Sequence, residues 1–118
     1  MDLSASTPRL RREQVAGMNI HYIMWSLDYF LDAQQRLGFK TIELWAAEPH
    51  VTLDHTGYFE ADELRRKIES RGLSVSSLCP ENVVYPWQYA ARKPLHAQRS
   101  LAYFKHGIEL AEVLGAPY

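Results

Sequence analysis

Apolar residues change their spacing several times along this chain of 118 residues, and each change predicts a new element. Three short runs are almost continuous in apolar and β-branched residues, at 18–25, 40–47 and 73–79. Runs of this length between turn residues predict strands that are covered on both faces, which is typical of parallel sheets. We therefore predict three β-strands at these positions.

The segments that follow the strands carry apolar residues at helical spacing instead, and predict helices over 26–37, 60–71 and 94–114. Ser26 is suited to cap the first helix, and a glycine follows the end of each. The third helix has the clearest amphipathic pattern in the chain, which predicts its packing face. That pattern consists of Ala97, Leu101, Phe104, Ile108 and Ala111.

Strands and helices therefore alternate as βαβαβα, which implies parallel strands joined by right-handed crossovers. A sheet of three strands leaves two open edges, whereas a (β/α)8 TIM barrel usually needs about 250 residues. We expect an α/β fold over 18–118, namely the N-terminal βαβαβα portion of a TIM barrel that is incomplete in this chain. Residues 1–17 are polar and predict a mostly disordered extension.

Composition narrows the class of protein. The net charge is −1 and 47% of the residues are hydrophobic, so neither nucleic acid nor a membrane is the expected partner. Cys79 is the only cysteine, which excludes an internal disulfide and suits a cytoplasmic location. We expect Cys79 to be a small buried residue rather than a nucleophile.

Candidate chemistry gathers where the predicted strands end, since function in α/β folds lies at the carboxyl ends of the strands. Alternation along the second strand places Glu43 and Trp45 on one face, opposite Ile42 and Leu44. If the aliphatic pair faces the helices, Glu43 and Trp45 face the barrel interior. The pattern leaves three roles open for Glu43: a core glutamate held by a partner, a polar contact to substrate, or catalysis.

Other candidates lie in the loops. His50 is either a pocket residue or an ordinary loop histidine, and the spacing of the histidines predicts no metal site in this segment. Trp87, with Tyr85 and Tyr89, either lines a sugar-sized pocket or packs the loop. The common nucleotide, zinc-ribbon and hydrolase motifs do not occur.

Three stretches together carry a family resemblance: "LGFKTIELWAAEPH", "RGLSVSSLCPENVVYP" and "RSLAYFKHGIELAEVLGAPY". Over residues 18–118 the chain resembles the sugar-phosphate isomerase/epimerase superfamily of xylose isomerase-like TIM barrels, and most of all the ketose 3-epimerases and fructoselysine 3-epimerase-like members. The resemblance implies a divalent cation, Mn²⁺ or Mg²⁺, and two glutamates that exchange a proton beside a ketose carbonyl. The metal ligands and catalytic glutamates of that family come from later strands, so the resemblance assigns no catalytic or metal-binding residue and no cofactor to this segment.

What the resemblance implies for this chain is a wall of a site for a sugar or sugar phosphate. The residues expected to bind substrate are Trp25, Glu43, Trp45, His50, Glu81 and Trp87. We expect these 118 residues to be inactive alone, as a fragment, so whether the chain is itself an enzyme is left open. The alternatives are an inosose dehydratase, hydroxypyruvate isomerase or endonuclease IV-like branch, or a non-catalytic half-barrel that associates through its open sheet edges.

Overall fold

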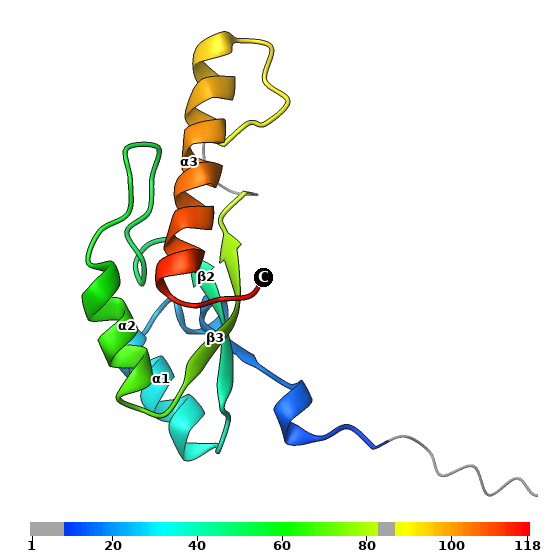
Figure 1. Cartoon of the computed structure of the whole chain (residues 1–118), viewed down its shortest axis with the longest axis vertical. Helices are drawn as coiled ribbons and strands as arrows, with labels where there is room; N and C mark the ends of the chain where they lie inside the picture. Colours follow the sequence, from blue (N-terminus) through cyan, green and yellow to red (C-terminus); the bar gives the residue numbers. More distant parts are fainter. Residues whose placement is uncertain (1–8, 83–86) are drawn as a thin grey trace, which may run out of the picture.

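The computed structural model describes residues 9–82 and 87–118, and Figure 1 shows how its elements follow one another. In chain order they are η1 (Arg12–Gln14), β1 (Gly17–Met18), η2 (Asn19–Tyr22), α1 (Leu27–Arg36), β2 (Thr41–Ala46), α2 (Ala61–Glu69), β3 (Ser74–Pro80) and α3 (Pro94–Val113). The α/β alternation that the hydrophobic pattern predicts is therefore confirmed.

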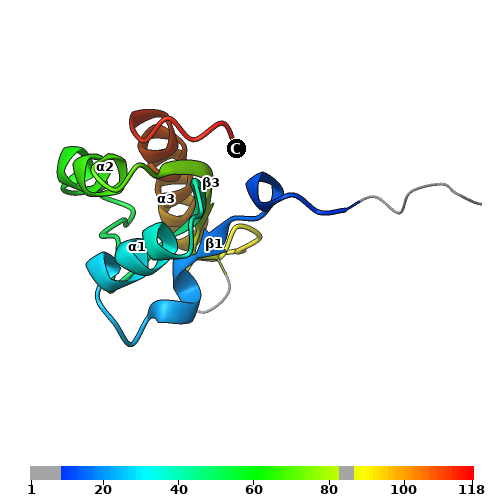
Figure 2. The same ribbon diagram turned by 90° about the horizontal axis from the view of Figure 1, so that it is seen from below.

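The described strands form one parallel sheet in the order β1-β2-β3. Figure 2, seen along the sheet, shows α1, α2 and α3 on the same side of it. The chain then returns to the sheet at its end, where the backbone N–H of Leu78 donates to the carbonyl of Tyr118 (2.8 Å). This arrangement matches the N-terminal part of a TIM barrel, with the sheet still open.

The core lies between the sheet and the helices. Ile42, Leu44 and Ala46 of β2 are fully buried, and Phe30 and Leu31 of α1 pack against them. Burial of this apolar surface is the main force that holds the helices to the sheet. Helix α1 begins and ends as the sequence predicts. At its start, Ser26 Oγ accepts from the N–H of Tyr29, and after its end Gly38 has the positive φ of 77° that is typical of a helix stop.

The predicted packing face of α3 is wrong. Leu101, Phe104 and Ile108 are 53%, 44% and 58% exposed, whereas the buried side consists of Ser100, Tyr103, Gly107 and Leu110. The reason is close approach. A Cβ on Gly107 would lie 3.0 Å from the ring of Pro80, so the absence of a side chain lets α3 press against the end of β3.

The first predicted strand, 18–25, is also wrong in extent. Only Gly17 and Met18 pair with β2, and the chain then turns into η2. Asn19 is fully buried, and its side-chain amide bonds to both backbone groups of Trp45, in the place that a further strand residue would take. The predicted disordered extension, 1–17, stays a prediction, since residues 1–8 lie outside the described part of the chain; Gly17 already belongs to β1.

Candidate functional site

The face of the sheet that α1, α2 and α3 leave uncovered carries the chemically active side chains. In the register of the sheet, Glu43 lies opposite Ser77, and Trp45 lies opposite Cys79, with Glu81 directly after β3. Ile42 and Leu44 face the helices, so the predicted orientation of Glu43 and Trp45 is confirmed. We call these five residues, Glu43, Trp45, Ser77, Cys79 and Glu81, the open-face group.

A β-bulge in β3 aligns this group. The register shifts between Ile42 and Glu43, so that Ser76 is an extra residue, and its hydroxyl donates to the carbonyl of Ile42 (3.0 Å). Because of the extra residue, Val75 and Leu78 both pair with helix-facing residues of β2 although they are three apart. Cys79 thereby shares a face with Trp45.

A buried hydrogen bond joins Trp45 and Glu81 of the open-face group. The indole Nε1–H of Trp45 donates to a carboxylate oxygen of Glu81 (2.9 Å). Both residues are buried, at 8% and 5% exposed, so the hydrogen bond compensates part of the desolvation of the carboxylate. The contact places a fixed acceptor and a flat apolar ring beside each other at the carboxyl end of the sheet.

Cys79 is poorly suited to nucleophilic chemistry. Burial raises the pKa of its thiol, and the charges of Glu43 and Glu81 raise it further, since a thiolate beside two carboxylates is disfavoured. The side chain is half-buried rather than fully buried. The burial expected for Cys79 is therefore only partial.

Asn19 belongs to the site and was missed by the sequence reasoning. Its Oδ1 accepts from the backbone N–H of Trp45 (2.7 Å), and its Nδ2 donates to the Trp45 carbonyl (3.0 Å). His50 adjoins it, with Nδ1 at 3.0 Å from the same Nδ2 and Nε2 at 2.8 Å from the Trp25 carbonyl. The signal was available, because an asparagine inside the apolar stretch "MNIHYIMW" needs buried partners.

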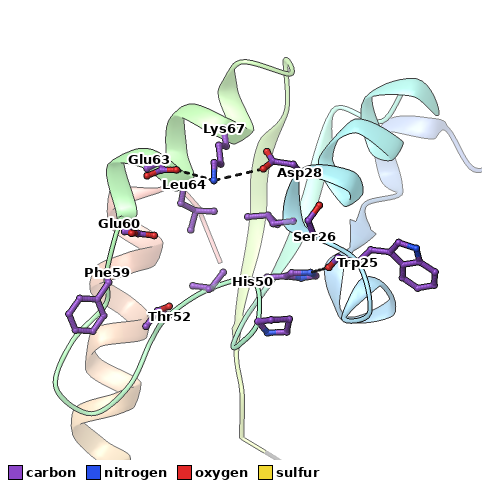
Figure 3. Close-up of a pocket in the computed structure, with 13 residues that line it drawn as sticks. Trp25, Ser26, Asp28, His50, Thr52, Phe59, Glu60, Glu63, Leu64 and Lys67 are labelled. Carbon is purple, nitrogen blue, oxygen red and sulfur yellow. Dashed lines mark hydrogen bonds and ion pairs between the residues drawn. The ribbon is translucent and has the colours of Figure 1, made fainter.

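Trp25 contributes its backbone rather than its ring. The indole is 52% exposed and stacks on Tyr29 of α1 (centroids 6.1 Å apart). Figure 3 shows the ring turned away from a cavity of about 320 Å³ between α1, α2 and the loop after β2, while the carbonyl meets His50. The structure therefore does not bring the Trp25 side chain to the open-face group.

The ring of Trp87 packs against α3 and the loop between β2 and α2. Its ring stacks on Tyr103 of α3, with centroids 4.1 Å apart and an interplanar angle of 7°, and His55 lies 6.0 Å away. Burial raises the pKa of the Tyr103 hydroxyl, in keeping with its place in the core. This packing favours the loop role over a sugar platform for Trp87; Tyr85 lies outside the described residues.

Metal ligands do not gather in the part of the chain that the structure describes: no group of three His, Cys, Asp or Glu side chains is placed to hold an ion. Within the open-face group, one carboxylate oxygen of Glu81 accepts from Trp45, and Glu43 lies opposite Ser77 in the register of the sheet. Among the same residues, no helix is both long and apolar enough to cross a membrane.

Comparison with known proteins fits this picture. The sequence model of the xylose isomerase-like TIM barrel family matches residues 31–118, most of the chain, from α1 to the tail beside β3. The chain therefore belongs to the xylose isomerase-like TIM barrel family. Neither a curated protein nor a solved structure matches it.

Proposed function

We propose that this chain forms part of the substrate-binding wall of a sugar or sugar-phosphate isomerase or 3-epimerase. The observation that carries the proposal is the open-face group of β2 and β3: an indole hydrogen-bonded to a buried carboxylate near the carboxyl ends of these two parallel strands, with a second carboxylate on the same face. In TIM barrels this is the end of the sheet at which substrates bind.

The chemistry of these residues suits a sugar. The face of an indole packs on the apolar C–H face of a sugar ring, and carboxylate oxygens accept hydrogen bonds from hydroxyl groups. Glu81 already accepts from Trp45, which fixes its direction, and Glu43 supplies a second acceptor on the same face. Both act as binding groups in this proposal, and no proton transfer is assigned to either.

Isomerisation or epimerisation beside a ketose carbonyl needs a base and an acid at that carbon, and in this family a divalent cation supplies Lewis-acid chemistry. Among the residues that the structure describes, no three His, Cys, Asp or Glu side chains are grouped to hold a cation. We therefore expect no turnover from these 118 residues alone. Incubation of a ketohexose with the chain and Mn²⁺ in D₂O, followed by NMR, tests this, and enzyme-dependent deuterium uptake beside the carbonyl would contradict it.

The proposed sugar contact is tested by saturation-transfer NMR with a ketohexose and with its phosphate ester. We expect transfer from the chain to the sugar protons, and loss of the transfer in Trp45→Leu. Trp25→Leu is the matched control, because it removes an exposed indole outside the open-face group. Absence of transfer to both sugars, or equal loss in the two variants, would exclude Trp45 as a sugar contact.

A second candidate function is association with a second copy of the chain, and the outer face of α3 favours it. An apolar groove of about 460 Å³ lies between β3, α3 and the C-terminal tail, lined by Leu78, Phe104, Ile108, Ala116 and Tyr118 among others. At Leu78 the outer edge of β3 already donates its N–H to the Tyr118 carbonyl of the chain's own tail. Two copies placed head to tail would bring the β1 edge of one beside the β3 edge of the other, with the strands parallel.

Sedimentation velocity over a concentration series tests this association. We expect a dimer that Ile108→Lys converts to a monomer, whereas Leu37→Lys, a charge added at an equally exposed leucine of the α1 end, leaves it unchanged. A monomer at every concentration with a cooperative thermal transition would exclude the second candidate.

A further inference from the structure

A chain of hydrogen bonds joins the ends of β1 and β2, and its donors and acceptors can be assigned one by one. Trp45 donates its N–H to Asn19 Oδ1 and accepts at its carbonyl from Asn19 Nδ2. Reversal of the Asn19 amide would place oxygen against oxygen and N–H against N–H at a fully buried position. The orientation of this amide is therefore determined by the strand beside it.

The orientation of Asn19 determines the state of His50. Nδ2 of Asn19 can only donate hydrogen bonds, and it lies 3.0 Å from Nδ1 of His50. Nδ1 must therefore accept, so it carries no proton. The other ring nitrogen, Nε2, lies 2.8 Å from the carbonyl of Trp25, which can only accept, so Nε2 holds the hydrogen. His50 is therefore neutral, in its Nε2–H tautomer.

We propose that His50 is a pH-operated latch between the β1–α1 connection and the β2–α2 loop. Protonation of Nδ1 would set two donors against each other, and Asn19 cannot reverse its amide without loss of both bonds to Trp45. Histidine is the side chain that ordinarily changes charge between about pH 5 and 8. The latch is closed with the neutral ring and releases when the ring becomes charged.

The surroundings of His50 define what moves. The backbone N–H groups of His50 and Val51 both donate to the carbonyl of Ala47, and Val51 is buried, so its own loop stays in place. The connection that ends in Trp25 is held less firmly, because Ile23, Met24 and Trp25 are all exposed. We infer that this connection is the part that moves when the latch opens.

Charged groups of α1 and α2 line the same cavity as His50. The cavity that His50 lines also receives Asp28 from α1, and Glu60, Glu63 and Lys67 from the start and body of α2 (Figure 3). Glu48 lies in the loop of His50 itself, bonded to Thr52. Lys67 is paired with Glu63 (2.9 Å) and Asp28 (3.9 Å), and Arg71 also pairs with Asp28 (2.9 Å).

The test is a pH titration of the unmodified chain by long-range ¹H–¹⁵N NMR of the imidazoles. At pH 7.5 we expect the His50 pattern of an Nε2–H tautomer. On acidification the Asn19 side-chain amide and the backbone amides of Trp25 and Ser26 should shift together with the charging of the His50 ring. His21, an exposed histidine of η2, should titrate without any effect on the Asn19 signals.

A second variant separates the latch from general acid effects. In His50→Gln the side-chain amide can accept from Asn19 and does not titrate, so the Asn19 and Trp25 signals should lose their pH dependence over the same range. Two results would overturn the proposal: an Nδ1–H tautomer at pH 7.5, or a charged His50 ring with the Asn19 and Trp25 signals unmoved.

Discussion

The two faces of one strand, β2, differ in nearly every respect. Ile42, Leu44 and Ala46 face the helices and are fully buried among aliphatic and aromatic side chains. Glu43 and Trp45 face the other way, beside Ser77, Cys79 and Glu81, where no helix of the described chain covers the sheet. One face therefore packs against the helices, and the other carries the open-face group, in which Trp45 and Glu81 are buried.

Alternation explains how both are encoded in six residues, because successive side chains of a strand point to opposite faces. The same rule fails in β3 unless the bulge at Ser76 is included, since Val75 and Leu78 share a face at a spacing of three. The assignment of β3 side chains to the two faces thus depends on one extra residue, Ser76, whose hydroxyl donates to the carbonyl of Ile42.

The largest expected effect separates the faces by stability. Leu44→Ala removes fully buried atoms from the core and should lower the free energy of unfolding by about 2–5 kcal/mol. Ser77→Ala on the open face should change it by less than about 1 kcal/mol. Urea unfolding followed by circular dichroism measures both, and similar losses would show that the open face is part of the core.

The next effect is expected at the junction of the faces. Asn19→Ala leaves the N–H and carbonyl of Trp45 without their side-chain partner, and buried unsatisfied groups cost about 1–3 kcal/mol each. We expect a loss on the order of 2–4 kcal/mol in the same urea experiment. The control is His21→Ala, at an exposed position two residues further along. An equal loss of unfolding free energy in both variants would contradict the role of Asn19 as the partner of the Trp45 backbone.

A smaller effect is expected where β1 meets α1. A Cβ on Gly17 would overlap the side-chain amide of Gln34, so Gly17→Ala should cost about 1–3 kcal/mol by overpacking. Gln34 Oε1 has no hydrogen-bond partner among the described residues, so its truncation removes no hydrogen bond at that atom. The double variant with Gln34→Ala should recover most of the loss, and additive losses would contradict the overlap.

The smallest effect concerns charge on the open face. Because the charge of Glu43 helps to raise the pKa of the Cys79 thiol, Glu43→Gln should lower that pKa and leave more thiolate at pH 8. Alkylation by iodoacetamide should then become faster by about two- to threefold, since one pKa unit is a tenfold change in thiolate. Glu48→Gln, in the exposed loop, serves as the control. An unchanged alkylation rate of Cys79 in Glu43→Gln would show that the charge of Glu43 does not act on the thiol.

Sequence reasoning succeeded where periodicity and local turn chemistry decide the structure. The positions of α1, β2, α2 and β3 follow from apolar spacing, the Ser26 cap and the glycine stops, and the direction of Glu43 follows from alternation. The family resemblance agrees with the match over 31–118, while the closer relation to ketose 3-epimerases stays a prediction.

The failures have tertiary causes. Gly107 and Tyr103 form the packing face of α3 because β3 approaches closely there, and no local pattern favours them over Leu101 and Ile108. The short β1 depends on the Asn19 amide, which replaces a strand residue only when Trp45 lies beside it. The expectation that Trp25 and Trp87 belong to the substrate wall stays a prediction; their rings lie against Tyr29 and Tyr103.

The central claim is that the open face binds a sugar while the opposite face serves only as core. A ¹H–¹⁵N NMR titration of the chain with a ketohexose measures this at the Trp45 indole N–H, which donates to Glu81. We expect its resonance, and the backbone amides of Cys79 and Glu81, to shift progressively with sugar while the amides of α1 and α2 stay unchanged. A silent Trp45 indole, or shifts confined to the helices, would contradict the claim.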